Sequence, residues 1–136
     1  MKDALQTLNC DIAVIGGGPA GMMAAGTAAA SGADVILIEK NRRPGRKLLI
    51  TGKGRCNITN AAPDVRGFLE HFGKKGRYLH SLLHAFSIDD TISFFTGRGC
   101  PVKVERGNRV FPESDSAADV LRVLQEYMKE HGVRAL

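Results

Sequence analysis

Three glycines and one carboxylate stand at the spacing of a dinucleotide site. Gly16, Gly18 and Gly21 form the pattern G-x-G-x-x-G, and Glu39 follows Gly16 by 23 residues. The first glycine allows a sharp exit from a strand, the second lets a pyrophosphate approach the backbone, and the third lets a helix pack closely. Free N–H groups at the helix start favour phosphate. The acid can accept hydrogen bonds from ribose hydroxyls and would repel a 2′-phosphate, which favours FAD or NAD over NADP.

The elements around this turn are those that would position it. Residues 10–15 are an apolar run and predict a strand, and residues 20–30 are small and almost uncharged, which predicts a closely packed helix. Pro19 suits the first helical position because its φ is fixed. Residues 33–38 predict a second strand that ends at Glu39. A membrane span over residues 12–33 is disfavoured, because glycine and alanine supply too little hydrophobicity.

A basic segment follows the second predicted strand. Residues 40–55 hold seven of the nineteen basic residues and no acid. Glycines are interleaved with the cations, which favours a backbone that approaches an anion over a merely solvated face. Nucleic-acid binding is a weaker interpretation, because the segment has no aromatic residue for base stacking. The cations are Lys40, Arg42, Arg43, Arg46, Lys47, Lys53 and Arg55.

Four motifs in the chain resemble those of one known family. They are GGGPAG at the first turn, GRKLL at 45–49, TGKGRCN at 51–57 and GNRVFPES at 107–114. Together they resemble the N-terminal part of the BaiN/YhiN-like NAD(P)/FAD-dependent oxidoreductases, which are flavoproteins of the two-dinucleotide-binding-domain type. The resemblance runs through nearly the whole chain, and GRK with TGxGRCN is much more specific than the glycine turn alone.

The resemblance implies a set of residues that bind FAD. One part of this set would cradle the pyrophosphate and hold the adenosine ribose. A second part would neutralise the phosphates or contact the ribityl chain, and a third part would pass near the flavin. The first part is Gly16, Gly18, Pro19, Ala20, Gly21, Glu39 and the adjoining Lys40; the second is Arg46 and Lys47; the third is Gly52, Gly54, Arg55, Cys56 and Asn57.

The function implied by the resemblance is FAD-dependent oxidoreduction. NAD(P)H would reduce the flavin, and a small organic acceptor would take the hydride, while no side chain is indicated as a general acid or base. Because two phosphates do not need seven cations, Arg42 and Arg43 are candidates for a second anion, such as an acidic substrate or the phosphate of NADPH. The alternative is a truncated, non-catalytic module that binds FAD or ADP.

The cysteines and histidines indicate neither a disulfide framework nor a metal site. Cys10, Cys56 and Cys100 are odd in number and far apart, and residues 1–9 show no secretory signal, so we expect a reducing, cytoplasmic setting. Beside Arg55, Cys56 could be a thiolate, but close packing is favoured over a redox role. His80 and His84 are four residues apart, and a third ligand is missing.

The remaining segments predict helices and one hairpin. Residues 65–72, 77–86 and 87–96 read as helices, 102–105 and 109–111 as a hairpin, and the segment before Gly132 as a final helix capped by Ser114 or Ser116. Ser87 and Asp90 form a capping-box pattern. Residues 133–136 begin another strand. Side chains expected to be buried are Tyr78, Leu79, Leu82, Leu83, Phe86, Ile88, Ile92, Phe95, Ala117, Val120, Leu121, Leu124 and Met128.

These elements predict an α/β fold. It contains a Rossmann-like FAD-binding βαβ unit with additional helices and a β-hairpin, and its sheet is incomplete. Residues 1–136 would be the N-terminal portion of an FAD-binding domain, truncated at its C-terminus. We expect a small-molecule substrate, no nucleic acid and no membrane as partners, and the oligomeric state stays open.

Overall fold

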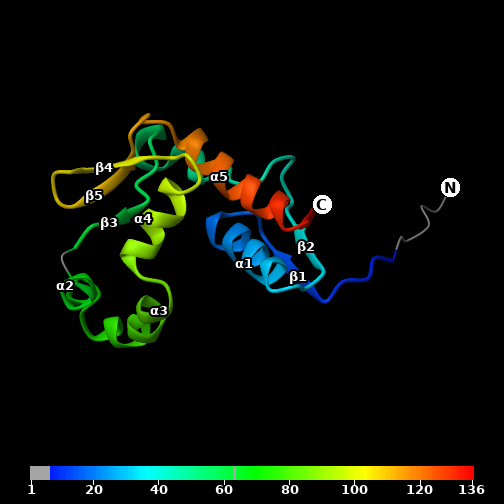
Figure 1. The fold of residues 1–136 in the computed structure, drawn as a ribbon, viewed down its shortest axis with the longest axis horizontal. Helices are drawn as coiled ribbons and strands as arrows, with labels where there is room; N and C mark the ends of the chain where they lie inside the picture. The colour runs from blue at the N-terminus through cyan, green and yellow to red at the C-terminus, as the bar shows by residue number, and fades with distance from the viewer. Residues whose placement is uncertain (1–6, 63) are drawn as a thin grey trace. The chain divides into compact units, whose positions relative to one another are not determined.

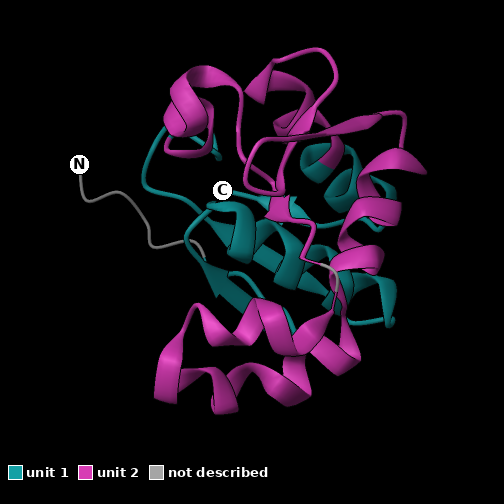
Figure 2. Cartoon of the chain, turned by 90° about the vertical axis from the view of Figure 1, so that its left-hand side faces the viewer, with its two compact units in different colours: residues 1–46, 124–136 teal, residues 47–123 magenta. Residues whose placement is uncertain are grey.

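The computed structural model describes residues 7–62 and 64–136. Its contacts divide the chain into two compact units, shown by colour in Figure 2. Unit 1 consists of Met1–Arg46 and Leu124–Leu136, and unit 2 is Lys47–Val123. Each unit is described separately below, with the element labels of Figure 1.

Unit 1 is built on a parallel sheet of three strands. The strands are β1 (Ile12–Ile15), β2 (Val35–Ile38) and β6 (Arg134–Ala135), in the order β1-β2-β6. Helix α1 (Pro19–Ala30) connects β1 to β2, so the predicted βαβ unit is confirmed. The strand predicted at 133–136 is β6, which pairs with β2.

The end of the chain is hydrogen-bonded into this sheet. The Leu136 N–H donates to the Leu37 carbonyl at 2.9 Å, and the Leu136 carbonyl accepts from the Glu39 N–H at 2.8 Å. The Arg134 guanidinium bonds the Asp34 carboxylate at 2.7 Å and the Asn9 carbonyl at 2.7 Å. The last strand therefore ties together the beginnings of β1 and β2 and the end of β2.

The core of unit 1 lies around β2. All of Val35–Leu37 is buried, as expected for a parallel strand between layers, whereas Ile12 and Ile15 of β1 are exposed. A Cβ at Gly26 of α1 would collide with the Tyr127 ring of α5 (Ala117–Glu130), so this glycine permits close packing. Buried apolar residues of unit 1 are Met22, Ala25, Ala29, Val35, Ile36, Leu37, Leu124 and Met128.

Unit 2 contains a small antiparallel sheet and several short helices. The sheet has the order β3-β5-β4 and is formed by β3 (Thr59–Asn60), β4 (Val102–Glu105) and β5 (Arg109–Pro112). The predicted hairpin is confirmed as β4 and β5, whereas β3 was not predicted. The helical elements are η1 (Leu48–Gly54), α2 (Val65–Glu70), η2 (Gly73–Leu79), α3 (His80–Ala85), α4 (Ile88–Thr96) and the first half of α5.

Helix α4 of unit 2 and helix α5, which is divided between the two units, were predicted correctly from local sequence signals. Ser87 caps α4: its hydroxyl accepts from the Asp90 N–H at 3.0 Å, while Asp90 accepts from the Ser87 N–H at 2.8 Å. The predicted capping box is therefore confirmed. Ile88 and Phe95 are buried as predicted, and Ile92 is half-buried. The predicted inward face of α5 is also buried throughout, from Ala117 to Met128.

The prediction of one helix over residues 77–86 with a buried face is wrong. The segment is a 3₁₀ turn, η2, followed by the six-residue α3, so its apolar residues do not fall on one helical face. Tyr78 is 66% exposed and Leu82 is 62% exposed, and Phe86 is also exposed.

The described residues include no helix long and apolar enough to cross a membrane.

Candidate cofactor site

The glycine turn connects β1 to α1 in unit 1. Gly16 has φ of +100°, a conformation that favours glycine, and its N–H donates to the Ile38 carbonyl at 2.8 Å. A Cβ at Gly21 would overlap the Gly16 carbonyl oxygen, which explains why the helix needs a glycine there. A Cβ at Gly18 would meet no atom within 4 Å. The turn therefore leaves open space beside Gly18, where a pyrophosphate could approach the backbone.

The N-terminus of α1 is the positive end of the helix dipole. Gly18 is the N-cap residue, no side chain caps the helix, and its first turn contains no acid. Pro19 occupies the first helical position as predicted. Ala20, the next residue, is exposed. The N–H groups of this first turn, which lack intrahelical partners, are suited to bind phosphate oxygens.

Glu39 lies beside the same turn. Its Oε2 accepts from the Gly17 N–H at 2.7 Å, and its Oε1 accepts from the Asn41 N–H at 2.9 Å and from the Asn41 side-chain amide. Bonds from the Asn41 and Gly17 N–H groups hold the pKa of Glu39 below its usual range, so the side chain is a carboxylate. A carboxylate oxygen has two acceptor positions, so Oε2 can accept one further bond from a ribose hydroxyl.

The loop after Glu39 packs against the turn. The Gly45 N–H donates to the Gly17 carbonyl at 2.7 Å, and a Cβ at Gly17 would lie 2.7 Å from the Pro44 Cβ. Asn41 also accepts a long bond, 3.4 Å, from Arg46. Sequence reasoning missed Asn41. An asparagine two residues after a strand-terminal acid was the available signal, because its side chain and N–H can both donate.

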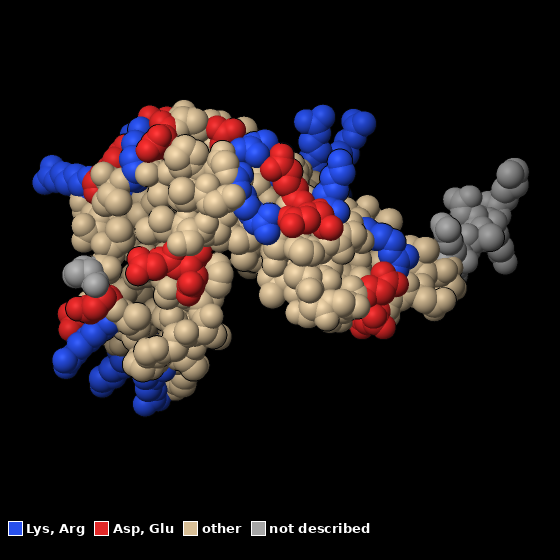
Figure 3. Space-filling model, in the orientation of Figure 1, with Lys and Arg blue, Asp and Glu red and all other residues tan. Residues whose placement is uncertain are grey.

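The basic residues of the segment 40–55 are mostly at the surface. Arg46 donates to the Asn41 side-chain oxygen, and it forms no ion pair with an acid among the described residues. Figure 3 shows one face of the molecule, on which both basic and acidic side chains occur and the basic ones stand in separate small groups. The exposed cations are Lys40, Arg42, Arg43, Arg46, Lys47 and Lys53.

In unit 2 the TGKGRCN motif forms a loop with unusual backbone angles. Gly52, Lys53, Gly54 and Cys56 all have positive φ, between 53° and 85°. Two hydrogen bonds stay inside the loop, from the Arg55 N–H to the Gly52 carbonyl at 3.3 Å and from the Cys56 N–H to the Thr51 carbonyl at 3.1 Å. Left-handed angles at non-glycine residues are strained and are concentrated at functional sites.

Arg55 is held by acids and by an aromatic ring. Its Nη1 donates to Glu105 at 2.8 Å and to Asp115 at 3.3 Å, and its guanidinium lies 4.1 Å from the centre of the Phe111 ring. Hydrogen bonding to Glu105 raises the pKa of Arg55 above its ordinary value. The structure thus gives one nitrogen of Arg55 two acidic partners, and the predicted place of Arg55 beside the flavin stays a prediction.

Cys56 is buried, whereas Asn57 is exposed. Burial raises the pKa of the Cys56 thiol, although a hydrogen bond with Thr51 opposes this shift. The thiol is therefore neutral at pH 7, which favours the packing interpretation over the thiolate. All three cysteines are free.

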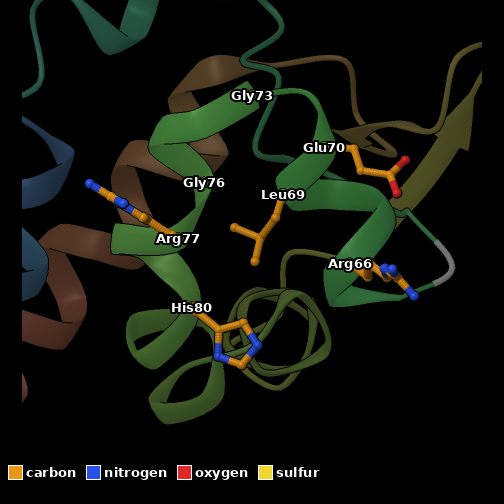
Figure 4. Close-up of a pocket in the computed structure, with 7 residues that line it drawn as sticks. All are labelled: Arg66, Leu69, Glu70, Gly73, Gly76, Arg77 and His80. Atoms are coloured by element: carbon orange, nitrogen blue, oxygen red, sulfur yellow. The ribbon is translucent and has the colours of Figure 1, made fainter.

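The histidines form no metal site in the described part of the chain. The His80 and His84 rings lie 4.6 Å apart, but no group of three metal-ligating side chains exists among the residues described. His80 instead lines a hollow of about 550 Å³ between α2 and η2, together with Leu69 and Arg77. Figure 4 shows the Arg66 and Arg77 side chains pointing away from each other, so this hollow does not converge on an anion.

The structure brings the predicted site residues together in two groups. In unit 1 Gly16, Gly18, Gly21 and Glu39 share one turn, with Asn41 added. In unit 2 the residues from Gly52 to Asn57 form one loop. The first group has open space beside Gly18; in the second, Gly52, Lys53 and Asn57 are exposed, whereas Cys56 is buried.

Comparisons with known proteins agree with this geometry. The model of the family described as "HI0933-like protein Rossmann domain" matches residues 10–136. The chain is 37% identical over 125 residues to the 3-dehydro-bile acid delta(4,6)-reductase of Clostridium scindens, and the match covers 90% of this chain and 30% of the relative. It is 30% identical over 123 residues to the ribosomal RNA dihydrouridine synthase of Escherichia coli, with the same two coverages.

A solved structure shows the same fold. An open conformation of a flavocytochrome c3 fumarate reductase superposes with a TM-score of 0.70 at 24% identity, over 93% of this chain and 26% of that one. At this identity the likeness concerns the fold alone. The chain spans about 30% of the length of the two curated relatives described above.

Proposed function

Because the chain belongs to the family of HI0933-like Rossmann domains, we propose that it binds FAD and serves flavin-dependent oxidoreduction. The family match confirms the resemblance seen in GRKLL and TGKGRCN. The observation that carries the proposal is the open space beside Gly18, at the uncapped start of α1 and on the same turn as an ionised Glu39.

The chain's own residues would bind and orient the cofactor. The Gly16–Gly21 turn would receive the pyrophosphate, and Glu39 would accept a bond from the adenosine ribose through Oε2. Asn41 holds the Glu39 carboxylate toward Gly17, and Arg46 and Lys47 would add positive charge for the phosphates. When bound, the flavin itself supplies the hydride chemistry, and the protein supplies binding and electrostatics.

The reductant and the acceptor are part of the same proposal. We take NAD(P)H as the source of hydride and a small organic molecule as its acceptor. The name of the Clostridium scindens relative, a reductase of a bile acid, supports this choice of substrate class. Arg42 and Arg43 are exposed and would contact a second anion, either an acidic substrate or the phosphate of NADPH.

RNA is the second candidate substrate. The Escherichia coli relative is named for dihydrouridine synthesis in ribosomal RNA, so the absence of a nucleic-acid partner stays a prediction. The exposed cations of segment 40–47 favour this candidate. RNA binding through them would weaken steeply with salt, because several phosphates are bound at once, whereas binding of a small molecule with one or two charges would weaken much less.

Gly18→Ala is the sharpest test of the site. The new methyl group meets no protein atom, and Gly18 has φ of −75°, so the fold should be unaffected or slightly stabilised. The same methyl group would occupy the approach of the pyrophosphate, so we expect FAD affinity to fall about tenfold or more, measured by flavin fluorescence titration.

Gly67→Ala is the matched control, because a Cβ there makes only ordinary contact with Asp64. It should leave FAD affinity unchanged. Equal FAD affinity in the wild type and Gly18→Ala would contradict the site.

In wild-type protein that binds FAD, bleaching of the flavin band by NADPH supports the enzyme, and flavin that does not bleach supports a non-catalytic module.

A further inference from the structure

The loop at residues 52–56 needs an external support. Four of its five positions have positive φ, and two of these, Lys53 and Cys56, are not glycine. Such angles persist only where surrounding contacts enforce them. The segment has two backbone hydrogen bonds of its own, one of ordinary length at 3.1 Å and one long at 3.3 Å, and we infer that these two bonds do not enforce the conformation alone.

The β4–β5 hairpin and the residues after it provide that support. Phe111 is buried on β5, and its ring contacts the loop twice: the Arg55 guanidinium lies 4.1 Å from the ring centre, and a Cβ at Gly52 would lie 3.0 Å from the ring. Glu105 on β4 and Asp115 after β5 then bond the same guanidinium nitrogen. The loop is therefore fixed at both its beginning and its end.

The charge of Arg55 is already balanced inside this cluster. Asp115 also bonds Lys103 at 2.6 Å, so the cluster holds two cations, Arg55 and Lys103, and two carboxylates. Both acids bond the same nitrogen, Nη1, and their carboxylates offset the positive charge that Arg55 could offer to a pyrophosphate. Within residues 7–62 and 64–136, Arg46 hydrogen-bonds only a neutral amide, that of Asn41, so no carboxylate there offsets its charge.

We propose that Arg55 is a positioning residue: it holds the 52–57 loop on the hairpin, and it does not bind the phosphates of the cofactor. The inference rests on the proposed FAD site, to which this loop would contribute its backbone and Asn57. It replaces direct contact by Arg55, which the family resemblance implies, with an indirect role through Phe111, Glu105 and Asp115.

The two roles predict opposite responses to removal of the acids. If Arg55 bound phosphate, the double variant Glu105→Gln with Asp115→Asn would release its charge, and FAD affinity would stay equal or increase. If Arg55 holds the loop, the same variant should weaken FAD binding about tenfold and raise amide exchange at Arg55 and Cys56 by a similar factor, even without FAD.

Arg55→Lys provides the second, milder variant. A lysine keeps the charge but loses the planar group that stacks on Phe111 and bonds two acids together. We expect it to behave like the double variant, with faster exchange of the loop amides. Retention of wild-type exchange and of FAD affinity in Arg55→Lys would overturn the proposal.

Arg109→Lys is the matched control. The Arg109 guanidinium lies 5.7 Å from the centre of the same ring and donates to the Arg106 carbonyl, and in the described part of the chain it forms no hydrogen bond or ion pair with the loop. It should leave loop exchange and FAD affinity unchanged. If wild-type protein takes up no FAD, the proposed function fails, whereas amide exchange of the loop still decides whether Arg55 holds it.

Discussion

The glycine turn of unit 1 and the 52–56 loop of unit 2 are held in different ways. The turn is shaped by backbone geometry: Gly21 lies against the Gly16 carbonyl, and Glu39 bonds the N–H groups of Gly17 and Asn41. The loop is shaped by side chains, with Arg55 between two acids and an aromatic ring. We infer that the turn is sensitive to added atoms, whereas the loop is sensitive to removed ones.

Phe111→Ala should have the largest effect, and it should be confined to unit 2. The ring is 2% exposed and carries both loop contacts, so its loss should reduce the free energy of unfolding by about 3–5 kcal/mol. Urea denaturation measures this change, and amide exchange should increase at residues 52–57. Unchanged amide exchange in the loop would show that the Phe111 ring does not support it.

Gly21→Ala is the reciprocal change in unit 1. Its Cβ would overlap the Gly16 carbonyl oxygen, and backbone cannot move aside as a flexible side chain can. We expect a loss of about 2–4 kcal/mol by the same denaturation experiment. Amide exchange should increase around residues 16–22 and not in the loop. An unchanged free energy of unfolding in Gly21→Ala would mean that close packing at this glycine is not needed.

Gly17→Ala tests the packing of the following loop on the turn. The added Cβ would lie 2.7 Å from the Pro44 Cβ, so we expect a cost of about 1–3 kcal/mol. Pro44→Gly removes the opposing atom, and the double variant should be less destabilised than the sum of the two single variants. Simple additivity in this cycle would show that the two residues do not interact.

Glu39→Gln should have the smallest effect on stability and a distinctive pH dependence. Because the folded-state pKa of Glu39 is lowered, its carboxylate stabilises the fold above its usual value near 4.5. This contribution is lost as the pH falls through the lowered folded value. The difference between wild type and variant in urea midpoint should be constant from pH 7 to about 5 and shrink toward pH 3.

The comparison with Gln isolates Glu39 from other acids with lowered pKa, such as Asp90 and Asp115, because both proteins contain them. A difference in midpoint that stays constant down to pH 3 would contradict the assigned charge. A difference that grows on acidification would reverse the sign expected from the hydrogen bonds to Glu39.

The parts of the molecule that could be predicted from the sequence are those whose structure depends on residues close together in the chain. The turn, Glu39 and the capping box of Ser87 depend on residues close in sequence or on one regular βαβ unit. The partners of Arg55 lie 50 and 60 residues away, and only the folded hairpin brings them near. Tyr78 and Leu82 were wrongly placed in a core, because a regular helix was assumed where a 3₁₀ turn interrupts the segment.

The bond from Glu39 to Leu136 links the nucleotide turn to the strand β6. Since the Leu136 carbonyl accepts from the Glu39 N–H, the backbone that follows β6 holds the main chain directly behind that acid. We therefore expect nucleotide affinity to respond to substitutions in this strand, although it lies far along the sequence from the glycine turn.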